Sequence, residues 1–324
     1  MSKDYFLGID TSNYKTSVAV VDSEENVIAD RRMFIKVQKG ERGIRQSEAL
    51  FQHINNLPLI MEEVSGILNT ADKSACVKAV AVSSRPRPVK KSYMPVFLAG
   101  VSLGRSLAGI MKIPVYEFSH QEGHIAAAQS CTELKNCSRF IAFHFSGGTT
   151  EAVLVERSGV NSIDYKVVGG SRDISYGQLL DRIGVAGGLR FPCGCELDKI
   201  ACDEKAEHTN IPKIKCRDGY VNLSGIETHC LRFMDRYNKD ISSPQVRDMI
   251  FSVFKEISLS MGNITEFLAR KYNVGDFLYA GGVSSSEFLR RHFKSEHNIY
   301  FAKPELSTDN AVGTALLGRQ RYGA

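Results

Sequence analysis

The sequence lacks the long apolar stretch that a membrane-spanning helix needs. No run of about 18 or more apolar residues occurs in the chain. Met1–Asp4 leads straight into an apolar strand, where an exported protein would carry a charged and then an apolar leader. These two absences predict a cytoplasmic protein with no membrane partner.

The CxxC pairs of many metal-binding and redox motifs are also missing. The eight cysteines among the 324 residues are therefore expected to stay reduced, as in most cytosolic proteins. Cys193 and Cys195 form the one close pair. Two interpretations of this pair stay open: a redox or metal element, or loop cysteines without a special role.

A large excess of charge of one sign is absent as well. The formal net charge is +5, with 24% charged and 43% hydrophobic residues. This charge balance is compatible with an anionic partner but does not predict nucleic-acid binding. Nucleic-acid binding would be indicated by a larger excess of positive charge or by a stripe of basic residues. Length and composition predict a globular α/β protein of one large unit or two domains.

The sequence does contain two histidines four residues apart, His120 and His124. Residues at i and i+4 share one face of a helix, so both imidazoles can bind one metal ion. Ser119 and Glu122 form a capping box that predicts the start of this helix. The helix dipole there favours the neutral ring that a metal binds. The alternative is a polar, exposed helix start, and a third ligand must come from elsewhere because HExxH is absent.

A strand, a polar turn and a second strand occur twice in the chain. The first copy spans residues 5–22 and the second residues 140–155, with Ser, Thr or Gly in both turns. Each copy alone would be an ordinary hairpin. Together they predict two related lobes facing a cleft, each offering a turn of backbone N–H groups to a phosphate.

The spacing of apolar residues, and the glycines, prolines and small polar residues that bound them, predict the remaining helices and strands. We expect helices at residues 46–68, 96–111, 247–272 and 286–293, and strands at 77–83 and within 277–284. The first helix has apolar residues at positions 50, 54, 57, 60 and 64, and Pro58 predicts a break or kink in it. Ser243 and Pro244 are expected to begin the third helix, and Ser307–Asn310 to open the last one.

Taken together, these segments resemble the TsaD family, the threonylcarbamoyltransferases of tRNA adenosine modification, formerly labelled glycoproteases. The resemblance runs nearly end to end, through seven segments in the same order. They are LGIDTS at 7–12, LGRSLA at 103–108, HQEGH at 120–124, FSGGTTE at 145–151, LSGIET at 223–228, AGGVSS at 280–285 and STDN at 307–310. Several such segments in order are more specific than any one of them.

The resemblance implies a two-lobed actin-like ATPase (ASKHA) fold of the α/β class, with duplicated mixed sheets flanked by helices around a central cleft. Residues 1–118, completed by the C-terminal helix at 304–324, would form the N-terminal lobe, and residues 119–303 the C-terminal lobe. TsaB-like proteins are implied as partners.

The resemblance also implies the ligands and their residues. His120, His124 and Asp309 would bind one divalent metal, iron or zinc, with positions left open for substrate oxygens. The residues with an implied catalytic role are Asp10, Ser146 and Thr149. The residues that would bind an adenine nucleotide or adenylate are Gly147, Gly148, Asp173, Gly177, Asp181, Gly194, Gly281, Gly282 and Ser286.

The implied reaction moves a threonylcarbamoyl or carbamoyl group from an adenylate to an acceptor amine, in the family the exocyclic amine of a tRNA adenine. Such a reaction needs an electrophile for the charge developing on the carbamate and phosphate, and donors around the leaving phosphate. Ser146–Thr149 would supply those donors.

The sequence departs from the family pattern where the chemistry should be most constrained. An acidic Asp-Glu pair is Tyr14-Lys15 here, and a Gly-Pro-Gly loop is Arg85-Pro86-Arg87. The further replacements are Thr149 for His, Ile174 for Asp, Gln178 for Glu and Ser286 for Asn. Most charge changes run toward positive, so we infer a divergent paralogue whose substrate or partner is more anionic.

The basic loop after the strand at 77–83 fits this inference. Its basic residues are Arg85, Arg87, Lys90 and Lys91. In open α/β sheets ligands bind at strand ends, and the planar arginine fork makes two charge-assisted bonds to a phosphate. We predict that these residues and Lys15 contact tRNA or another anionic substrate; the alternative is a solvated surface loop.

Two other functions stay open. The lost Asp-Glu pair and Asn favour a small-molecule carbamoyltransferase or a nucleotide hydrolase on the same scaffold. A non-catalytic nucleotide-binding partner protein is the second alternative. A protease has little support, because HExxH is absent and no Ser/His/Asp grouping follows from spacing.

Overall fold

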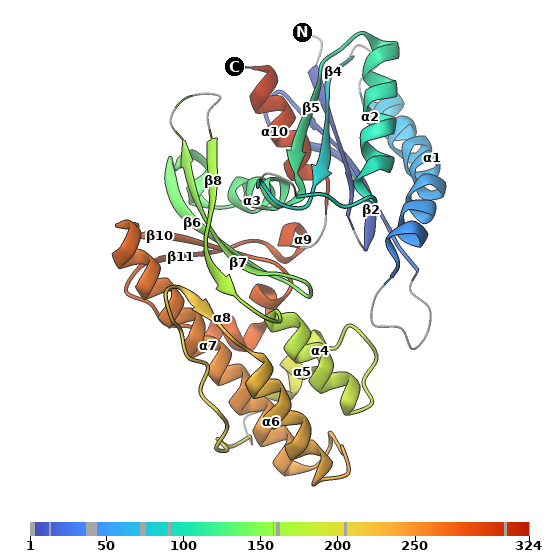
Figure 1. Ribbon diagram of the computed structural model, residues 1–324. Helices are drawn as coiled ribbons and strands as arrows, with labels where there is room; N and C mark the ends of the chain where they lie inside the picture. The colour runs from blue at the N-terminus through green and yellow to red at the C-terminus, as the bar shows by residue number, and fades with distance from the viewer. Residues whose placement is uncertain are drawn as a thin grey trace. The chain divides into compact units, whose positions relative to one another are not determined.

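The computed structural model of the chain (Figure 1) divides into two compact units. It describes residues 4–12, 14–36, 44–71, 76–89, 92–157, 159, 163–203, 206–307 and 310–323. The first unit comprises Met1–Cys131, Arg157–Ile163 and Thr308–Ala324, and the second Thr132–Glu156 and Asp164–Ser307. The predicted lobe boundaries lie at 118/119 and 303/304. The helix with the histidine pair belongs to the first compact unit, whereas the prediction assigned it to the C-terminal lobe.

The first unit is built on a sheet with strands β1 (Asp4–Thr11), β2 (Lys15–Asp22), β3 (Val27–Phe34), β4 (Cys76–Arg85) and β5 (Val115–Ser119). Among the described residues the order is β3-β2-β1-β4-β5. Strands β1 to β3 form an antiparallel meander, and β4 and β5 run parallel to β1. The carboxyl ends of β1, β4 and β5 therefore meet at one edge of the sheet.

Helices cover both faces of this sheet (Figure 1). They are α1 (Gln46–Ala71), α2 (Phe97–Met111), α3 (His120–Ser130) and α10 (Val312–Tyr322). Successive strand residues point to opposite faces. Ile9 accordingly packs near Gly104 of α2, and Gly8 directly against Ala311 and Ala315 at the start of α10.

Helix α1 differs from its prediction in two respects. It continues through Pro58 without a break. Its buried face is also rotated relative to the apolar pattern, since Ile54 is 54% exposed and His53 is fully buried. Three of the five predicted apolar positions are buried as expected, whereas Ile54 and Leu50 line an apolar groove of about 640 Å³ between α1 and α2.

The second unit repeats the strand arrangement of the first. Its strands are β6 (Arg139–Phe145), β7 (Thr150–Arg157), β8 (Ile163–Ser171), β9 (Tyr220–Val221), β10 (Asp276–Ala280) and β11 (Asn298–Phe301). The order among described residues is β11-β10-β6-β7-β8-β9. A hairpin, β6 and β7, lies beside two parallel strands, β10 and β11, just as β1 and β2 lie beside β4 and β5. The predicted internal repeat is confirmed.

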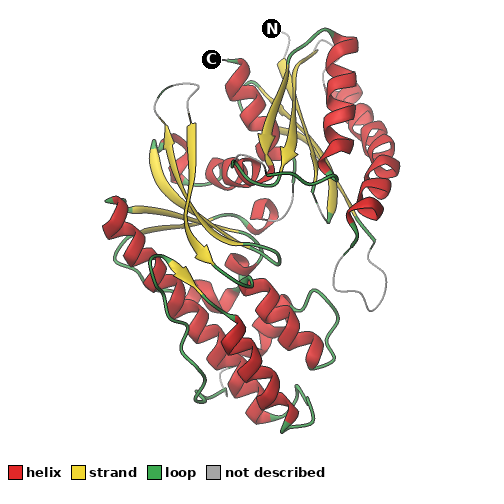
Figure 2. Cartoon of the chain, viewed as in Figure 1, coloured by secondary structure: helices red, strands yellow, loops and turns green. Residues whose placement is uncertain are grey.

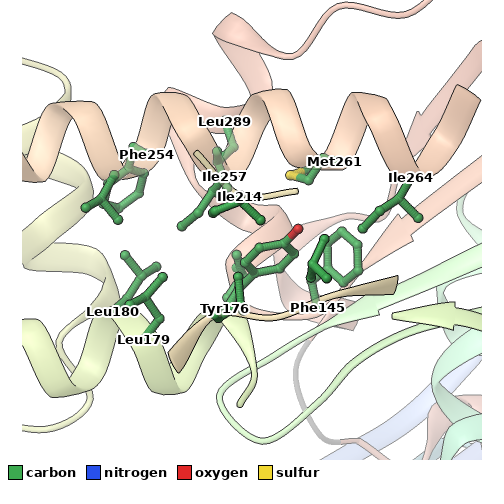
Figure 3. Packing of buried hydrophobic residues seen from close by; sticks show 14 of the residues in the cluster. Phe145, Tyr176, Leu179, Leu180, Ile214, Phe254, Ile257, Met261, Ile264 and Leu289 are labelled. Carbon is green, nitrogen blue, oxygen red and sulfur yellow. The ribbon is translucent and has the colours of Figure 1, made fainter. Parts of the chain in front are cut away.

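The second unit buries its core between its sheet and a group of helices (Figure 2). They are α4 (Tyr176–Ala186), α5 (Gly194–Ala201), α6 (Ser224–Asp235), α7 (Pro244–Tyr272), α8 (Glu287–His292) and α9 (Pro304–Ser307), with 3-10 turns at Glu133–Asn136 and Val283–Ser285. Figure 3 shows Phe254, Ile257 and Met261 of α7 facing Tyr176 and Leu179 of α4. As predicted, α7 starts at Pro244 behind the cap Ser243, whose hydroxyl accepts from the Val246 N–H.

The last helix starts later than predicted. Ser307 ends α9, and α10 begins at Val312, whose N–H donates to Oδ1 of Asn310. Thr308 and Asp309 lie outside the described residues. No helix in the described part of the chain is long and apolar enough to cross a membrane.

The contact between β1 and α10 gives a first testable prediction. A Cβ on Gly8 would lie 2.4 Å from the carbonyl oxygen of Ala311 and 2.6 Å from the amide nitrogen of Ala315. Gly8→Ala should therefore lower the free energy of unfolding by about 3 kcal/mol, at the upper end of overpacking costs because backbone must move. Urea denaturation followed by circular dichroism measures this change.

Gly66→Ala is the matched control. Gly66 lies inside α1 with no atom within 4 Å of an added Cβ, so the exchange should raise stability by about 0.5–1 kcal/mol. Equal effects of the two substitutions would contradict the close packing of α10 on β1.

Candidate functional site

The first candidate site is built at the start of α3. The predicted capping box is confirmed: Oγ of Ser119 accepts from the Glu122 N–H at 3.2 Å, and the Glu122 carboxylate accepts from the Ser119 N–H at 2.6 Å. Ser119 is also the last residue of β5. The chain therefore turns from strand to helix at one residue, and the two histidines follow at the carboxyl edge of the sheet.

Asp10, His120 and His124, which we call the histidine site, form a chain of contacts. Nδ1 of His120 lies 2.9 Å from Oδ1 of Asp10, whose side chain is 1% exposed. The carboxylate accepts the Nδ1–H, so the neutral ring keeps its lone pair on Nε2. Nε2 of His124 lies 3.0 Å from Nε2 of His120. The spacing in the sequence predicted that the two histidines lie together. The fold of the sheet brings Asp10 next to them.

Helix α2 fixes the strand end that carries Asp10. The hydroxyl of Thr11 donates to the backbone carbonyl of Val96 at 3.0 Å and accepts from the Gly100 N–H at 3.2 Å. The ring of Phe97 lies 6.1 Å from that of His120, centroid to centroid. The histidine site is therefore bordered by the carboxylate of Asp10 and by the apolar ring of Phe97 from α2.

The paired Nε2 atoms fit a shared metal ion. Two nitrogen ligands each about 2.0–2.1 Å from a divalent ion, at angles of about 90–110°, are about 2.8–3.4 Å apart. A carboxylate on the outer nitrogen of one ring is the usual support for a metal-binding histidine. Among the described residues no three His, Cys, Asp or Glu side chains are grouped to hold an ion, and the predicted third ligand, Asp309, lies outside them.

The basic loop touches the start of α3. Arg85 is the last residue of β4, and its guanidinium lies 3.4 Å from the Glu122 carboxylate, with the arginine side chain 34% exposed. The Gln121 N–H donates to the carbonyl of Pro86 at 3.1 Å. Lys15 places its ammonium 5.0 Å from the ring centre of Phe34. The predicted residues Lys90 and Lys91 lie outside the described residues.

The second candidate site, in the second unit, is the glycine turn Ser146–Thr149 between β6 and β7. The Ser146 N–H donates to the carbonyl of Thr149 at 2.8 Å, and the Thr149 N–H donates to Oγ of Ser146 at 3.1 Å. Ser146 and Thr149, the predicted catalytic residues, thus close the turn. Gly147 and Gly148 between them are exposed.

Helix α4 packs directly on the glycine turn. A Cβ on Gly177 would lie 2.4 Å from Cα of Gly147 and 2.4 Å from the carbonyl oxygen of Ser146. The hydroxyl of Ser175 donates to the carbonyl of Gly147 at 2.8 Å. Gly177, predicted to contact a nucleotide, therefore allows the helix start to hold the turn in position.

A further pair of glycines follows β10, the parallel neighbour of β6. Gly281 has a φ of +95°, and a Cβ there would lie 2.3 Å from the carbonyl oxygen of Phe145. Gly282 has open space around it. Because β6 and β10 run parallel, both glycine turns lie at the same edge of the second sheet.

Three other predicted nucleotide residues lie on α4, α5 and α8. Ser286 caps α8, and its hydroxyl donates to Asp198, which also accepts from the Glu287 N–H. Gly194 opens α5 with nothing within 4 Å of an added Cβ. Asp181 accepts from the Cys193 N–H at 2.8 Å; burial raises its carboxyl pKa, and this hydrogen bond offsets part of the rise.

Cys193 gives no sign of a reactive thiol. Its side chain is buried, and burial raises the pKa of the thiol to about 11, with nearby Asp181 and Glu196 adding to the rise. A thiol with such a pKa stays protonated and inert at neutral pH. The structure therefore favours a loop role for Cys193 over a redox role.

Asp173 is fully engaged in hydrogen bonds. Its carboxylate accepts from the N–H groups of Leu223, the residue before α6, at 2.9 Å, of Ser224, the first residue of α6, at 2.9 Å, and of Ile174 at 2.8 Å. Burial alone would raise the pKa of Asp173, but these donors outweigh it and lower the pKa to about 2. The residue predicted to bind a nucleotide thus caps α6.

Comparison with known proteins identifies the family. Residues 26–316 match TsaD, described as tRNA N6-adenosine threonylcarbamoyltransferase. The chain belongs to the TsaD family. It is similar to the enzyme of that name from Dictyoglomus turgidum, with 29% identity covering 98% of this chain and 93% of the relative. The enzyme of Streptococcus gordonii is 28% identical, covering 91% and 85%.

Solved structures show the fold of this TsaD-family chain. Component A of the (R)-2-hydroxyglutaryl-CoA dehydratase of Acidaminococcus fermentans aligns with a TM-score of 0.55 at 13% identity, covering 99% of both chains. HypF of T. kodakarensis aligns with a TM-score of 0.59 at 13% identity, covering 99% of this chain and 48% of that one. Both have the actin-like ATPase fold, so the predicted fold class is confirmed.

Sequence reasoning missed polar residues, and contacts between residues it had named, in both units of the TsaD-family chain. His53 is a fully buried histidine in α1, Glu122 pairs with Arg85, and Asp198 joins α5 to α8. A histidine four residues before the buried Leu57 is a signal for the first. The other two contacts join distant segments and leave no local signal.

Asp173 provides a prediction on pH dependence. Its lowered pKa means that the carboxylate stabilises the fold fully above the unfolded pKa of about 3.9 and loses this effect as the pH falls toward 2. Asp173→Asn should therefore cost about 1 kcal/mol, equally at about pH 7 and about pH 5; solvent screening of this exposed carboxylate keeps the cost below the full shift. Urea denaturation at both pH values measures it.

Asp164→Asn, at an exposed position of β8, is the control and should change stability little at either pH. A cost for Asp173→Asn that disappears at about pH 5 would contradict the assigned cap.

Proposed function

We propose that this chain transfers a threonylcarbamoyl or carbamoyl group from an adenylate to an acceptor amine, which in a TsaD-family enzyme is that of a tRNA adenosine. Family membership over residues 26–316 supports the reaction class. The observation that carries the site assignment is the pair of Nε2 atoms 3.0 Å apart, with Asp10 on the outer nitrogen of His120. A cytoplasmic location and TsaB-like partners belong to the same proposal.

The histidine site would hold a divalent ion, iron or zinc, through His120, His124 and Asp309. When bound, the ion supplies a Lewis acid for an oxygen of the carbamate or phosphate. Asp10 keeps the proton of His120 on Nδ1 and so keeps Nε2 available as a ligand. The ring of Phe97 lies beside that of His120 and makes this side of the site apolar.

The glycine turns would bind the adenine nucleotide or adenylate. The exposed N–H groups of Gly147 and Gly148 are the donors that the turn can offer to a phosphate, because those of Ser146 and Thr149 already close the turn. The open backbone at Gly282 allows a ligand to approach closely. Preorganised donors of this kind stabilise charge on a leaving phosphate.

A metal and transfer assay tests this function. His120→Ala and His124→Ala should each reduce the metal content from about one ion per chain to less than about a tenth, because one imidazole and one carboxylate hold a divalent ion weakly. Both variants should also lose formation of threonylcarbamoyladenosine on tRNA. Elemental analysis measures the metal, and mass spectrometry of digested tRNA measures the product.

His208→Ala, which changes an exposed histidine in the second unit, should leave both readouts unchanged. Full metal content in both histidine variants would rule out the metal site. Release of AMP by the wild type without modified tRNA would favour the nucleotide hydrolase, and binding without turnover the non-catalytic partner protein.

We further propose that the basic loop contacts the anionic substrate through Arg85 and Arg87, helped by Lys15, Lys90 and Lys91. Arg85 also pairs with the Glu122 carboxylate, so its removal would disturb the start of α3 as well, and Arg87 is the simpler residue to change. Arg87→Ala should weaken tRNA binding and reduce the slope of log affinity against log salt by about 1 for a lost phosphate contact. Filter binding between about 0.05 and 0.3 M salt measures this slope.

Arg105→Ala, at an exposed arginine of α2 paired with Glu117, is the basic control and should leave the slope unchanged. An unaltered slope in the Arg85→Ala/Arg87→Ala double variant, with metal binding intact, would show that the loop is only a solvated surface.

A further inference from the structure

Arg290 of α8 is a half-buried arginine whose guanidinium is held by backbone carbonyls. Its Nε–H donates to the carbonyl of Ser284 at 2.9 Å, and an Nη2–H donates to the carbonyl of Ala302 at 2.8 Å. Ser284 and Ala302 are both fully buried. A buried carbonyl without a donor is costly, so the cation satisfies two acceptors that the interior would otherwise leave with one partner fewer.

The guanidinium is anchored to the end of two parallel strands. Its central carbon lies 5.1 Å from the ring centre of Phe301, the last residue of β11. The next residue, Ala302, donates its N–H to the carbonyl of Tyr279 in β10 at 2.9 Å. An arginine over an aromatic ring is held by its flat face as well as by its hydrogen bonds. The strand end is therefore the fixed side of the Arg290 contact.

Ser284, the other partner of the guanidinium, closes the turn that contains Gly281 and Gly282. Its hydroxyl donates to the carbonyl of Ala280, the last residue of β10, at 3.0 Å. This hydrogen bond spans both glycines. The backbone of Ser284 is thus the place where the glycine turn and Arg290 meet.

The turn at Gly281 lies directly against the end of β6. Gly281 has a φ of +95°, and a Cβ there would lie 2.3 Å from the carbonyl oxygen of Phe145. Phe145 ends β6 and comes directly before the glycine turn Ser146–Thr149. A displacement of Ser284 would therefore change the spacing between the two glycine turns.

We propose that Arg290 is a positioning residue for nucleotide binding: its guanidinium ties Ser284 to the end of β11 and so fixes the Gly281–Gly282 turn beside the turn Ser146–Thr149. The effect on binding rests on the proposed function of these turns, whereas the tie itself requires no ligand. Arg290 acts on the ligand through the backbone of the turn, because the carbonyls of Ser284 and Ala302 already hold its Nε and Nη2.

Full-length variants at this position separate geometry from charge. Arg290→Met keeps most of the unbranched stem and removes both hydrogen bonds. Arg290→Lys keeps the positive charge, but a single ammonium replaces the planar fork that reaches two carbonyls at once. Arg291→Met is the matched control, because Arg291 follows on the same helix, is 64% exposed and pairs with Glu287.

The first readout is the affinity for ADP, measured by calorimetry. Arg290→Met should weaken ADP binding about tenfold, which corresponds to about one hydrogen bond to a charged group. Arg290→Lys should recover only part of this loss, since one ammonium does not reproduce both contacts. Arg291→Met should bind ADP as the wild type does.

The second readout is hydrogen exchange of the amides of residues 281–286, compared with those of residues 253–265 in the middle of α7. Arg290→Met should speed exchange in the turn and leave that of α7 unchanged, because the tie acts on the turn. A role in overall stability alone would speed exchange in both segments. Unfolding in urea gives the folded fraction of each variant, so that both readouts refer to the folded protein.

Wild-type ADP affinity in Arg290→Met would overturn the proposal. Full affinity in Arg290→Lys would contradict it too, because charge alone would then suffice, and so would equal weakening in Arg291→Met. If Arg290→Met does not fold, the comparison of Arg290→Lys with the wild type decides the question. A wild type that binds no ADP at millimolar concentration would rule out the nucleotide site alone, and exchange in the turn would still test the tie.

Discussion

The backbone contact between α3 and α10 fixes the position of the histidine pair. A Cβ on Gly313 would lie 1.8 Å from the carbonyl oxygen of Gly123, so the two helices meet with no side chain between them. Gly123 lies next to His124, and α10 also packs on β1 at Gly8. The C-terminal helix therefore holds together the strand that carries Asp10 and the helix that carries its partner, His120.

The duplicated sheet explains why polar groups from distant segments gather. In the first unit Asp10, Arg85 and Ser119 stand at or near the ends of β1, β4 and β5, which run parallel. In the second unit the glycine turns end the parallel strands β6 and β10. Carboxyl ends of parallel strands share one sheet edge, which is where open α/β folds bind ligands.

Arg85 links the basic loop to the start of α3. Its guanidinium meets Glu122, a capping-box carboxylate between the two histidines in sequence. A charge on this loop is therefore linked to the first turn of α3.

The sequence by itself determined the elements that depend on near neighbours. The capping box at Ser119, the Ser243–Pro244 helix start and the two hairpins follow from interactions within a few residues. Seven short segments in order also sufficed to identify the family, and the match over residues 26–316 agrees with them.

Tertiary structure alone decided which face of α1 is buried, which residues support His120 and what Asp173 does. Ile54 is exposed and His53 buried because α2 and the β1–β2 turn lie where they do. Asp173 caps α6 across some fifty residues of chain, and Asp10 reaches His120 across more than a hundred. Periodicity and capping rules report contacts between residues close in sequence, whereas these partners come together only when separate strands and helices pack into one unit.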